Sequence, residues 1–223
     1  ERQIQDVLGA SKDDQQALSA MGRLHLAQGR YTDALAPFTR VVELNADNPM
    51  RGVSQELEAA YYSLGLAYIN LHRPEEALSS LKEALLIDRT DADAHYLRGL
   101  AYQQQGAHKE AAQALQEAVR FVPNYEDAYQ AMAQSYQALG LAPKVDYAMG
   151  MVSYSSGAYE AARDRLQAAV AADADFPEAS LGLGLTYERL GQVDLAREAY
   201  RRAVQLDPHS WLAQQRLAAL GGP

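Results

Sequence analysis

The chain has 223 residues, of which 48% are hydrophobic and 22% are charged, so it can bury a sizeable core and differs from a disordered segment. Its net charge of −9 argues against binding nucleic acid through a broad basic face. The absence of cysteine excludes disulfides, thiol catalysis and cysteine-liganded metals. No apolar run reaches the length of a membrane span, so we expect no membrane insertion.

The sequence leaves the cellular compartment open. A chain without cysteine suits both the cytoplasm, which is slightly favoured, and the periplasm. The first residue is Glu rather than Met, so we expect that an upstream segment, which could include a targeting signal, is missing. The scarcity of Lys relative to Arg and the abundance of Ala suggest a bacterial source with a GC-rich genome.

Small residues recur along the chain in three series that share one register. Each series advances by 34 residues, apart from one longer step of 43 and one half step of 17. In the first series, Ala133 divides the step of 51 between Gly99 and Gly150 into 34 and 17. The first series lies inside expected helices, the second at expected turns, and the third near the start of expected second helices. The series are Gly22, Gly65, Gly99, Gly150 and Gly184; Gly29, His72, Gly106, Gly140, Gly157 and Gly191; and Ala34, Ala77, Ala111, Val145, Ala162 and Ala196.

Residues 92–125 illustrate the repeating unit. A first helix is predicted to end at Gly106, and a second to stop before Pro123. Gly99 and Ala111 are small enough for the two helix backbones to approach closely, and Leu115 continues the apolar stripe. The unit is therefore a helical hairpin with one apolar face, which the next hairpin covers.

The spacing resembles the tetratricopeptide repeat, whose signature is W-x₂-L-G-x₂-Y followed by A-x₃-F and a late Pro. The best matches are Tyr61, Leu64, Gly65, Tyr68 and Ala77 in one repeat, and Leu183, Gly184, Tyr187, Ala196, Tyr200, Ala203 and Pro208 in another. The resemblance implies an all-α fold, an α-solenoid of antiparallel helix pairs. We expect about five full repeats, one half repeat and a C-terminal capping helix, with at least eleven helices and no sheet between residues 15 and 220.

In chain order, a helical N-terminal segment (1–14) precedes a first block, 15–142, and a second block, 143–220. The first block contains repeats 15–48, 58–91 and 92–125 and the half repeat 126–142. The second contains repeats 143–176 and 177–210 and a capping helix, 211–220. An insertion, Pro49–Leu57, follows the first repeat. We interpret it as a tolerated loop and a longer helix capped by Ser54; the alternative is a functional lip on the groove.

The half repeat admits two arrangements, because the helix at 145–156 fits the register of both neighbours. We favour two blocks joined by a hinge at Leu141-Ala142-Pro143, since Pro143 suits a boundary. This arrangement leaves apolar surface on helix 126–139 for a ligand, an N-terminal segment or a second copy. The alternative is a continuous solenoid in which helix 145–156 partners 126–139 and all later helices exchange faces.

Motifs for enzymatic chemistry are absent. The sequence has no GxSxG, P-loop, HExxH or EF-hand pattern, and its five histidines show no metal-ligand spacing. The acidic run Asp88–Asp93 lacks the glycine and glutamate of a calcium loop. We therefore expect no catalysis, no cofactor and no bound metal.

The resemblance places the binding surface on the inner face, which the first helix of each repeat lines in this family. We expect an apolar groove lined by Tyr, Leu and Gln that holds a partner peptide or helix; the alternative is that neighbouring helices bury these side chains. The inner positions also include Ser19, Arg23, Ser63 and Asp93, and Arg23 alone is basic, which argues against the carboxylate clamp of co-chaperones. The candidate residues are Tyr62, Leu66, Ile69, Asn70, Tyr96, Leu97, Leu100, Gln103, Gln104, Gln130, Gln134, Gln137, Tyr147, Met151 and Tyr154, with Leu181 and Leu185 at the same register.

Three functions fit these features. The first is a non-catalytic adaptor that binds a segment of another protein. The second is a self-assembling scaffold, with a homodimer formed through the 126–156 region. The third is the regulatory arm of a larger enzyme or complex.

Overall fold

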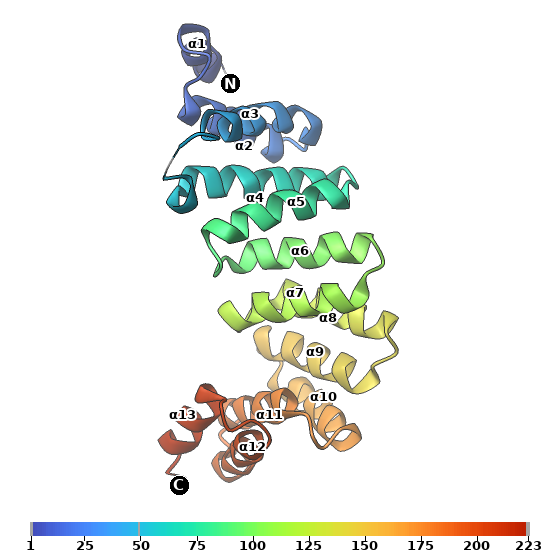
Figure 1. The fold of residues 1–223 in the computed structure, drawn as a ribbon. Coiled ribbons are helices and arrows are strands. Elements are labelled where there is room, and N and C mark those ends of the chain that lie inside the picture. Colours follow the sequence, from blue (N-terminus) through green and yellow to red (C-terminus); the bar gives the residue numbers. More distant parts are fainter. Residues whose placement is uncertain (1, 49, 222–223) are drawn as a thin grey trace. The chain divides into compact units, whose positions relative to one another are not determined.

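The computed structural model describes residues 2–48 and 50–221, and within these ranges it contains thirteen α-helices and no strand. This confirms the predicted all-α fold (Figure 1). None of the described helices combines the length and apolar composition needed to cross a membrane. The helices are α1 (Arg2–Ala10), α2 (Gln15–Ala27), α3 (Tyr31–Leu44), α4 (Gln55–Asn70), α5 (Pro74–Ile87), α6 (Ala92–Gln104), α7 (His108–Phe121), α8 (Glu126–Ala138), α9 (Ala142–Ser155), α10 (Tyr159–Ala172), α11 (Pro177–Arg189), α12 (Val193–Leu206) and α13 (Trp211–Ala219).

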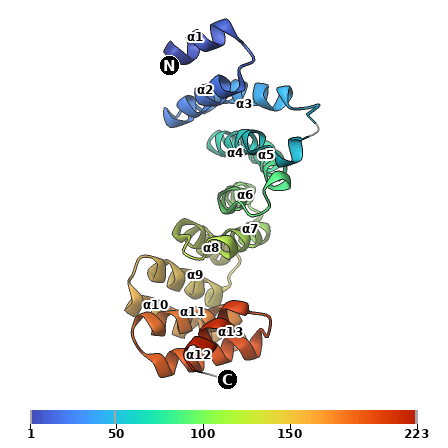
Figure 2. The same cartoon turned by 90° about the vertical axis from the view of Figure 1, so that its left-hand side faces the viewer.

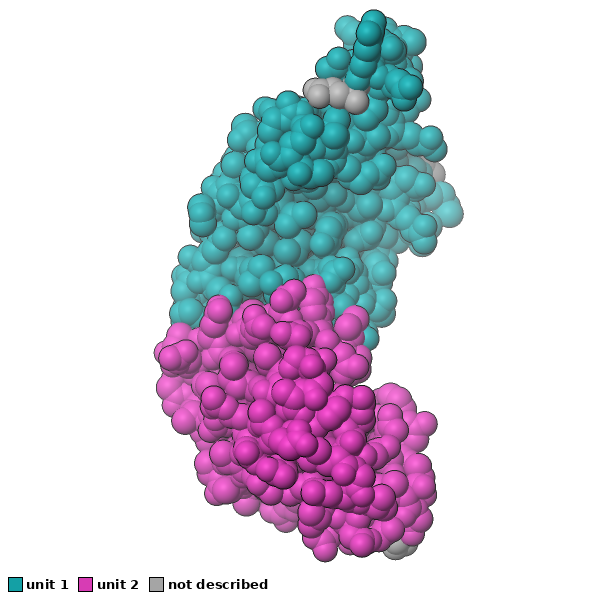
Figure 3. All heavy atoms as spheres, turned by 180° about the vertical axis from the view of Figure 1, so that it is seen from behind, with its two compact units in different colours: residues 1–121 teal, residues 122–223 magenta. Residues whose placement is uncertain are grey.

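The chain forms two compact units, with the division between Phe121 and Val122 (Figure 3). Unit 1 contains α1 to α7 and unit 2 contains α8 to α13. In unit 1 the pairs α2–α3, α4–α5 and α6–α7 are hairpins that stack in chain order (Figures 1 and 2). In unit 2, α9–α10 and α11–α12 are the corresponding hairpins.

The glycines inside the first helices make room for a large side chain of the second helix. A Cβ atom on Gly99 would lie 2.6 Å from Cγ of Leu115, which is closer than real Cβ contacts. The same relation joins Gly22 to Phe38, Gly65 to Leu81, Gly150 to Leu166 and Gly184 to Tyr200. These five large side chains are among the least exposed in the protein. Close packing thus explains why glycine occupies a helix interior despite its cost of about 1 kcal/mol.

The turn within each hairpin contains a residue of left-handed backbone conformation. Gly29, Gly106, Gly140, Gly157 and Gly191 have φ between 70° and 83°, and His72, at the same place between α4 and α5, has φ 54°. These six residues are the second series seen in the sequence. The backbone N–H of Gly106 donates to the carbonyl oxygen of Gln103 at 2.9 Å, so the turn satisfies a helix-terminal carbonyl.

The insertion lengthens α4. Ser54 lies at its N-terminus and its hydroxyl accepts a hydrogen bond from the backbone N–H of Leu57 at 3.2 Å, as the sequence predicts. Arg51–Val53 form a short 3₁₀ turn before this cap. Pro49, the start of the predicted loop, lies outside the described residues.

The half repeat is accommodated by α9, which pairs with α8 on one side and with α10 on the other. Gly140 and Gly157 form the same type of turn at its two ends, and the N–H of Leu141 donates to the carbonyl of Tyr136 at 3.0 Å. The predicted division at Leu141–Pro143 therefore differs from the observed one: it lies within unit 2, at an ordinary hairpin turn. On α8, Tyr129 and Met132 are buried rather than left as an open apolar surface.

Candidate functional site

Four large side chains form a row on the first helices α4 and α6 of unit 1: Tyr62, Leu66, Tyr96 and Leu100. We call it the tyrosine–leucine row. All four are half-buried, because they pack against a core cluster that contains Leu81. Each therefore has a buried side, which stabilises the hairpin stack, and an accessible side. A row of this kind offers apolar contact area and two phenol groups at little ordering cost.

Three of the sequence-predicted groove residues belong to the core instead. Ile69 is 7% exposed, and Leu97 and Met151 are each 4% exposed. Ile69 and Leu97 are members of the cluster beneath the row, and the sulfur of Met151 lies against Gly182 of α11. The positions predicted to line the groove extend around each first helix to the side that contacts the next first helix. These three residues therefore face a neighbouring helix and not solvent.

Two predicted amides make hydrogen bonds within unit 1. Gln104 donates from Nε2 to the carbonyl oxygen of Ile69 at 2.9 Å, which ties the end of α6 to the end of α4. Asn70 donates from Nδ2 to the carbonyl of Leu66 at 2.9 Å. Gln103 is half-buried and also interacts within the protein. Gln104 and Asn70 therefore satisfy carbonyl groups near the end of α4 before any ligand is considered.

Acidic side chains lie beside the tyrosine–leucine row. Burial, together with the nearby carboxylates of Asp91 and Asp88, raises the pKa of Glu58 to about 7. Burial, with Asp93 and Asp91 nearby, also raises the pKa of Tyr62 to about 12, so its phenol stays protonated at neutral pH. The row is therefore a neutral apolar surface with one negatively charged edge.

A concavity of about 690 Å³ lies in unit 2, on α8, α9 and α10. We call it the glutamine groove. Its α8 wall contains the three predicted residues Gln130, Gln134 and Gln137, all exposed. The other lining residues are Ala133, Gly140, Leu141, Ala142, Val145, Asp146, Met149 and Arg165.

The glutamine groove combines an apolar floor with polar walls. Val145 and Met149 of α9 are half-buried and form the floor. Opposite the glutamines, Nη1 of Arg165 lies 2.9 Å from Oδ1 of Asp146, so the second wall is close to neutral. The structure shows no hydrogen bond to Gln134 or Gln137 from the described residues, which leaves both carboxamides free to donate and accept.

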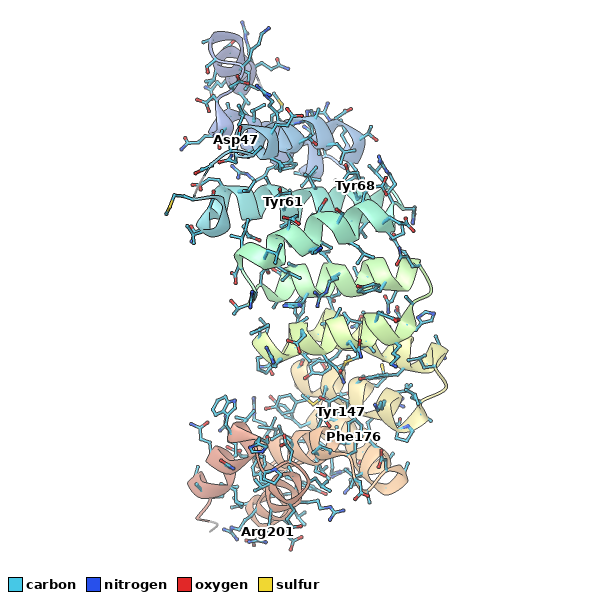
Figure 4. All side chains as sticks on the ribbon, viewed as in Figure 1. Asp47, Tyr61, Tyr68, Tyr147, Phe176 and Arg201 are labelled. Carbon is cyan, nitrogen blue, oxygen red and sulfur yellow. The ribbon has the colours of Figure 1, made fainter. Side chains whose placement is uncertain are left out.

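Tyr147 and Tyr154, also predicted in the groove, are elements of aromatic packing. The Tyr147 ring meets Phe176 edge to face at 5.0 Å and Tyr129 at 6.2 Å. Figure 4 shows Tyr147 and Phe176 side by side. Burial raises the pKa of Tyr147 well above its ordinary range. Tyr154 packs edge to face on Tyr159 at 5.6 Å. Both side chains are half-buried, and their described contacts are within unit 2.

Sequence reasoning assigned no binding role to the α9 and α10 residues of the glutamine groove, or to a smaller hollow of about 270 Å³ between α2 and α4. Arg23 and Ser63 line this hollow. The residues that were missed, Val145, Met149 and Arg165, belong to helices that the regular register treats as first and second helices of a new repeat. Their place beside α8 follows from the half repeat, which no single-repeat pattern predicts. Within the described ranges no cluster of His, Asp and Glu has a geometry suited to a metal ion.

A family model described as tetratricopeptide repeat matches residues 1–49, 62–126 and 147–210, well over half of the chain. Among curated proteins, none matches this sequence.

Three solved structures illustrate the likeness. MamA is 22% identical and aligns over 87% of this chain and 92% of its own, with a TM-score of 0.50. The first TPR domain of human RPAP3 is 21% identical over 56% of this chain and 92% of its own, also at 0.50. YrrB, described as a TPR protein with an unusual peptide-binding site, is 20% identical. It aligns over 95% of this chain and 96% of its own, with a TM-score of 0.49. At these identities the likeness to MamA and to the RPAP3 domain supports the fold alone.

Proposed function

This chain belongs to the tetratricopeptide repeat family, and from that premise we propose that it is a non-catalytic scaffold that binds a segment of another protein. The fold is typical of protein–protein interaction scaffolds, and proteins of the family are generally non-catalytic. The observation that supports the proposal best is the glutamine groove, a concavity of about 690 Å³ with an apolar floor and free carboxamides on one wall.

The spacing of the glutamines along α8 suits an extended peptide. Gln130, Gln134 and Gln137 follow one face of α8, so successive carboxamides lie about 4.5–6 Å apart along the helix. Alternate residues of an extended peptide repeat about every 6.6 Å, which lets neighbouring carboxamides meet successive backbone groups on one edge of a peptide. Side chains on the peptide face that is turned toward the floor would then lie on Val145 and Met149. We expect a segment of four or five residues with little net charge.

The tyrosine–leucine row offers a second contact surface for the same function. Its accessible side chains, Tyr62, Leu66, Tyr96 and Leu100, could hold the apolar face of a partner helix or peptide. Because the four side chains of the row are uncharged and we expect a segment with little net charge, affinity should change little between low and high salt.

The test uses peptides selected from a random phage-displayed library against the intact chain. A Gln134→Ala, Gln137→Ala variant should bind groove-directed peptides more weakly by about 1–3 kcal/mol, the sum expected for two lost hydrogen-bonding side chains. A Tyr96→Ala, Leu100→Ala variant should weaken the binding of peptides that contact the row by at least the same amount of free energy. Isothermal titration calorimetry measures both, and circular dichroism checks that each variant folds.

A Gln113→Ala, Gln205→Ala variant is the matched control, because both glutamines are exposed on second helices outside the two surfaces. It should bind like the parent chain. Selected peptides that bind equally well to all three variants would reject both surfaces.

A further inference from the structure

The charged wall of the glutamine groove is one ion pair between α9 and α10, which form a hairpin (Figure 2). Nη1 of Arg165 lies 2.9 Å from Oδ1 of Asp146. Among the described residues that line the groove, these two alone carry charge. Their side chains are 53% and 30% exposed, so an occupant of the groove meets both charges at once.

The lengths of the helix links fix the register of this wall. A link from a first helix to its second helix has three residues, as between Asn70 and Pro74. A link from a second helix to the next first helix has four, as between Ile87 and Ala92. Helix α9 lies between two three-residue links, so α10 is a second helix and pairs with α9. Residues of α10 can therefore be compared with those of the other second helices.

Arg165 is an exception at its position in the second helices. It stands three residues after Ala162, and the residues at the same position of α3, α5, α7 and α12 are Pro37, Ser80, Ala114 and Ala199. The last three of these are small and at most 9% exposed. The stem of Arg165 begins beside Gly150, because its Cβ atom lies 3.3 Å from a Cβ atom built there. Asp146, which binds the guanidinium, lies one turn before Gly150 on α9.

The floor beside the ion pair is an uncovered part of the repeat core. Val145 and Met149 of α9 correspond to Ala111 and Leu115 of α7, both of which are fully buried. In α9 the two side chains are only half-buried. A peptide that rests on this floor loses water from its inner side, so a charge on that side must be compensated by the groove.

We propose that Asp146 sets the charge preference of the glutamine groove: it binds Arg165, so that the groove takes an uncharged segment and rejects acidic and basic ones. A carboxylate that approaches Arg165 also meets Asp146, and an ammonium group meets the same two charges with opposite sign. Attraction and repulsion then offset each other, while the loss of hydration remains. The proposal rests on the proposed function of the groove and adds the residue that selects its partner segment.

Removal of either charge should convert the preference. In Asp146→Asn the guanidinium of Arg165 loses its carboxylate and can donate to an acidic side chain of the peptide. In Arg165→Gln the carboxylate of Asp146 attracts Lys or Arg. The double variant has neither charge, so it should again prefer an uncharged segment.

The experiment selects peptides from the random phage-displayed library against the intact parent chain and these three variants. Synthetic peptides then carry Asp, Asn or Lys at the position where Asp146→Asn selects an acidic residue, and isothermal titration calorimetry compares them. The parent chain should bind the Asn peptide at least about threefold more tightly than either charged peptide. Asp146→Asn should prefer the Asp peptide to the Lys peptide by at least about threefold, and Arg165→Gln should reverse that order, as expected for one partly exposed charge.

Asp175→Asn is the matched control. It removes the same charge from unit 2 and frees Arg202 from a carboxylate, since Nη2 of Arg202 lies 3.2 Å from Oδ1 of Asp175, outside the groove. This variant should select the same kind of peptide as the parent chain. Circular dichroism checks that every variant folds.

Peptides are groove-directed when Gln134→Ala, Gln137→Ala weakens their binding. If groove-directed peptides show one charge preference for the parent chain, Asp146→Asn and Arg165→Gln, the role of Asp146 is overturned and the groove stays the binding site. A shift with Asp175→Asn as large as that with Asp146→Asn also overturns it, because net charge would then explain the change. If no selected peptide is groove-directed, the proposed function of the groove fails, and the charge preference fails with it.

Discussion

Individual glycines decide how closely the helices of this protein pack. The five mid-helix glycines each face a large buried side chain, and the hairpin turns depend on residues with positive φ. Both roles follow from the missing Cβ atom, but the first concerns packing and the second backbone conformation. A substitution should therefore destabilise the protein through overpacking at the mid-helix positions and through backbone strain at the turns.

Gly99→Leu should lower the free energy of unfolding by about 1–3 kcal/mol, because the new side chain has no room beside Leu115. Gly184→Leu should destabilise the protein in the same way, because its side chain would meet the ring of Tyr200. Gly9→Leu is the control: Gly9 is also helical, but nothing lies within 4 Å of a Cβ built there. Urea denaturation checks all three, and equal midpoints for Gly99→Leu and the parent would remove the close contact from the explanation.

Glu58 should make stability depend on pH. Its pKa is about 7 in the folded protein, above the ordinary value of 4.5. The folded state therefore binds this proton more tightly than the unfolded state does. The resulting stabilisation is complete below pH 4.5 and is lost as the pH rises through 7.

Glu58→Gln should accordingly flatten the fall in Tm between about pH 5 and pH 8, because the variant has no carboxyl to ionise beside Asp91. Glu110→Gln, which removes the same charge from an exposed site on α7, should leave the slope unchanged. Differential scanning calorimetry at several pH values measures both. The explanation fails if the two variants have the same slope.

At the scale of elements, the links set the alternation of first and second helices. Helix α9 follows one three-residue link and precedes another, so it serves as a second helix for α8 and a first helix for α10. Its sequence permits this, because Gly150 faces Leu166 while Tyr147 packs on Tyr129 of α8. The half repeat thus needs no break in the helix stack of unit 2.

A substitution in the link between α4 and α5 should raise the stability of the protein. His72 adopts a left-handed conformation, φ 54°, that disfavours a residue with a Cβ atom. His72→Gly should therefore stabilise the protein by about 0.5–1 kcal/mol, after the larger entropy of the unfolded glycine chain is included. Gly106→Ala, at the equivalent link, should destabilise by a similar amount. Thermal unfolding followed by circular dichroism tests the pair, and a destabilised His72→Gly variant would contradict it.

At the scale of the whole molecule, the structure describes two compact units that divide between Phe121 and Val122. The predicted blocks divide instead near Pro143. The two divisions differ in whether α8 stays with α9, whose contact includes the Tyr129–Tyr147 ring pair.

Expression of the chain in two pieces distinguishes them. Fragments 1–121 and 122–223 should each be helical and unfold cooperatively, because each keeps its hairpins intact. Fragments 1–142 and 143–223 should be less stable, since the cut separates α8 from α9 and exposes Tyr129 and Met132. Circular dichroism and urea denaturation measure the four fragments. Greater stability of the second pair would favour the division near Pro143.

The sequence by itself determined the repeat, the helix pairs and the turns, because these depend on local features. Glycine and alanine recur at a spacing of 34 residues and mark where the two helices of a hairpin pack closely. The residues of the connecting turns stand at fixed distances from them. The same register identified Tyr62, Leu66, Tyr96, Leu100 and the three glutamines of α8 as accessible inner positions. Register alone could not separate these from Ile69, Leu97 and Met151, which share the inner face.

Only the tertiary structure decided how those positions divide between core and surface, and how the half repeat is resolved. Burial depends on how near the adjacent first helix lies, which is a property of helix packing and not of spacing. Ile69 and Leu97 are core residues because α4 and α6 meet there, whereas Gln134 and Gln137 stay exposed beside Val145 and Met149. The sequence of α9 fits both roles, but only the contacts that it makes with α8 and with α10 show that one helix fills both.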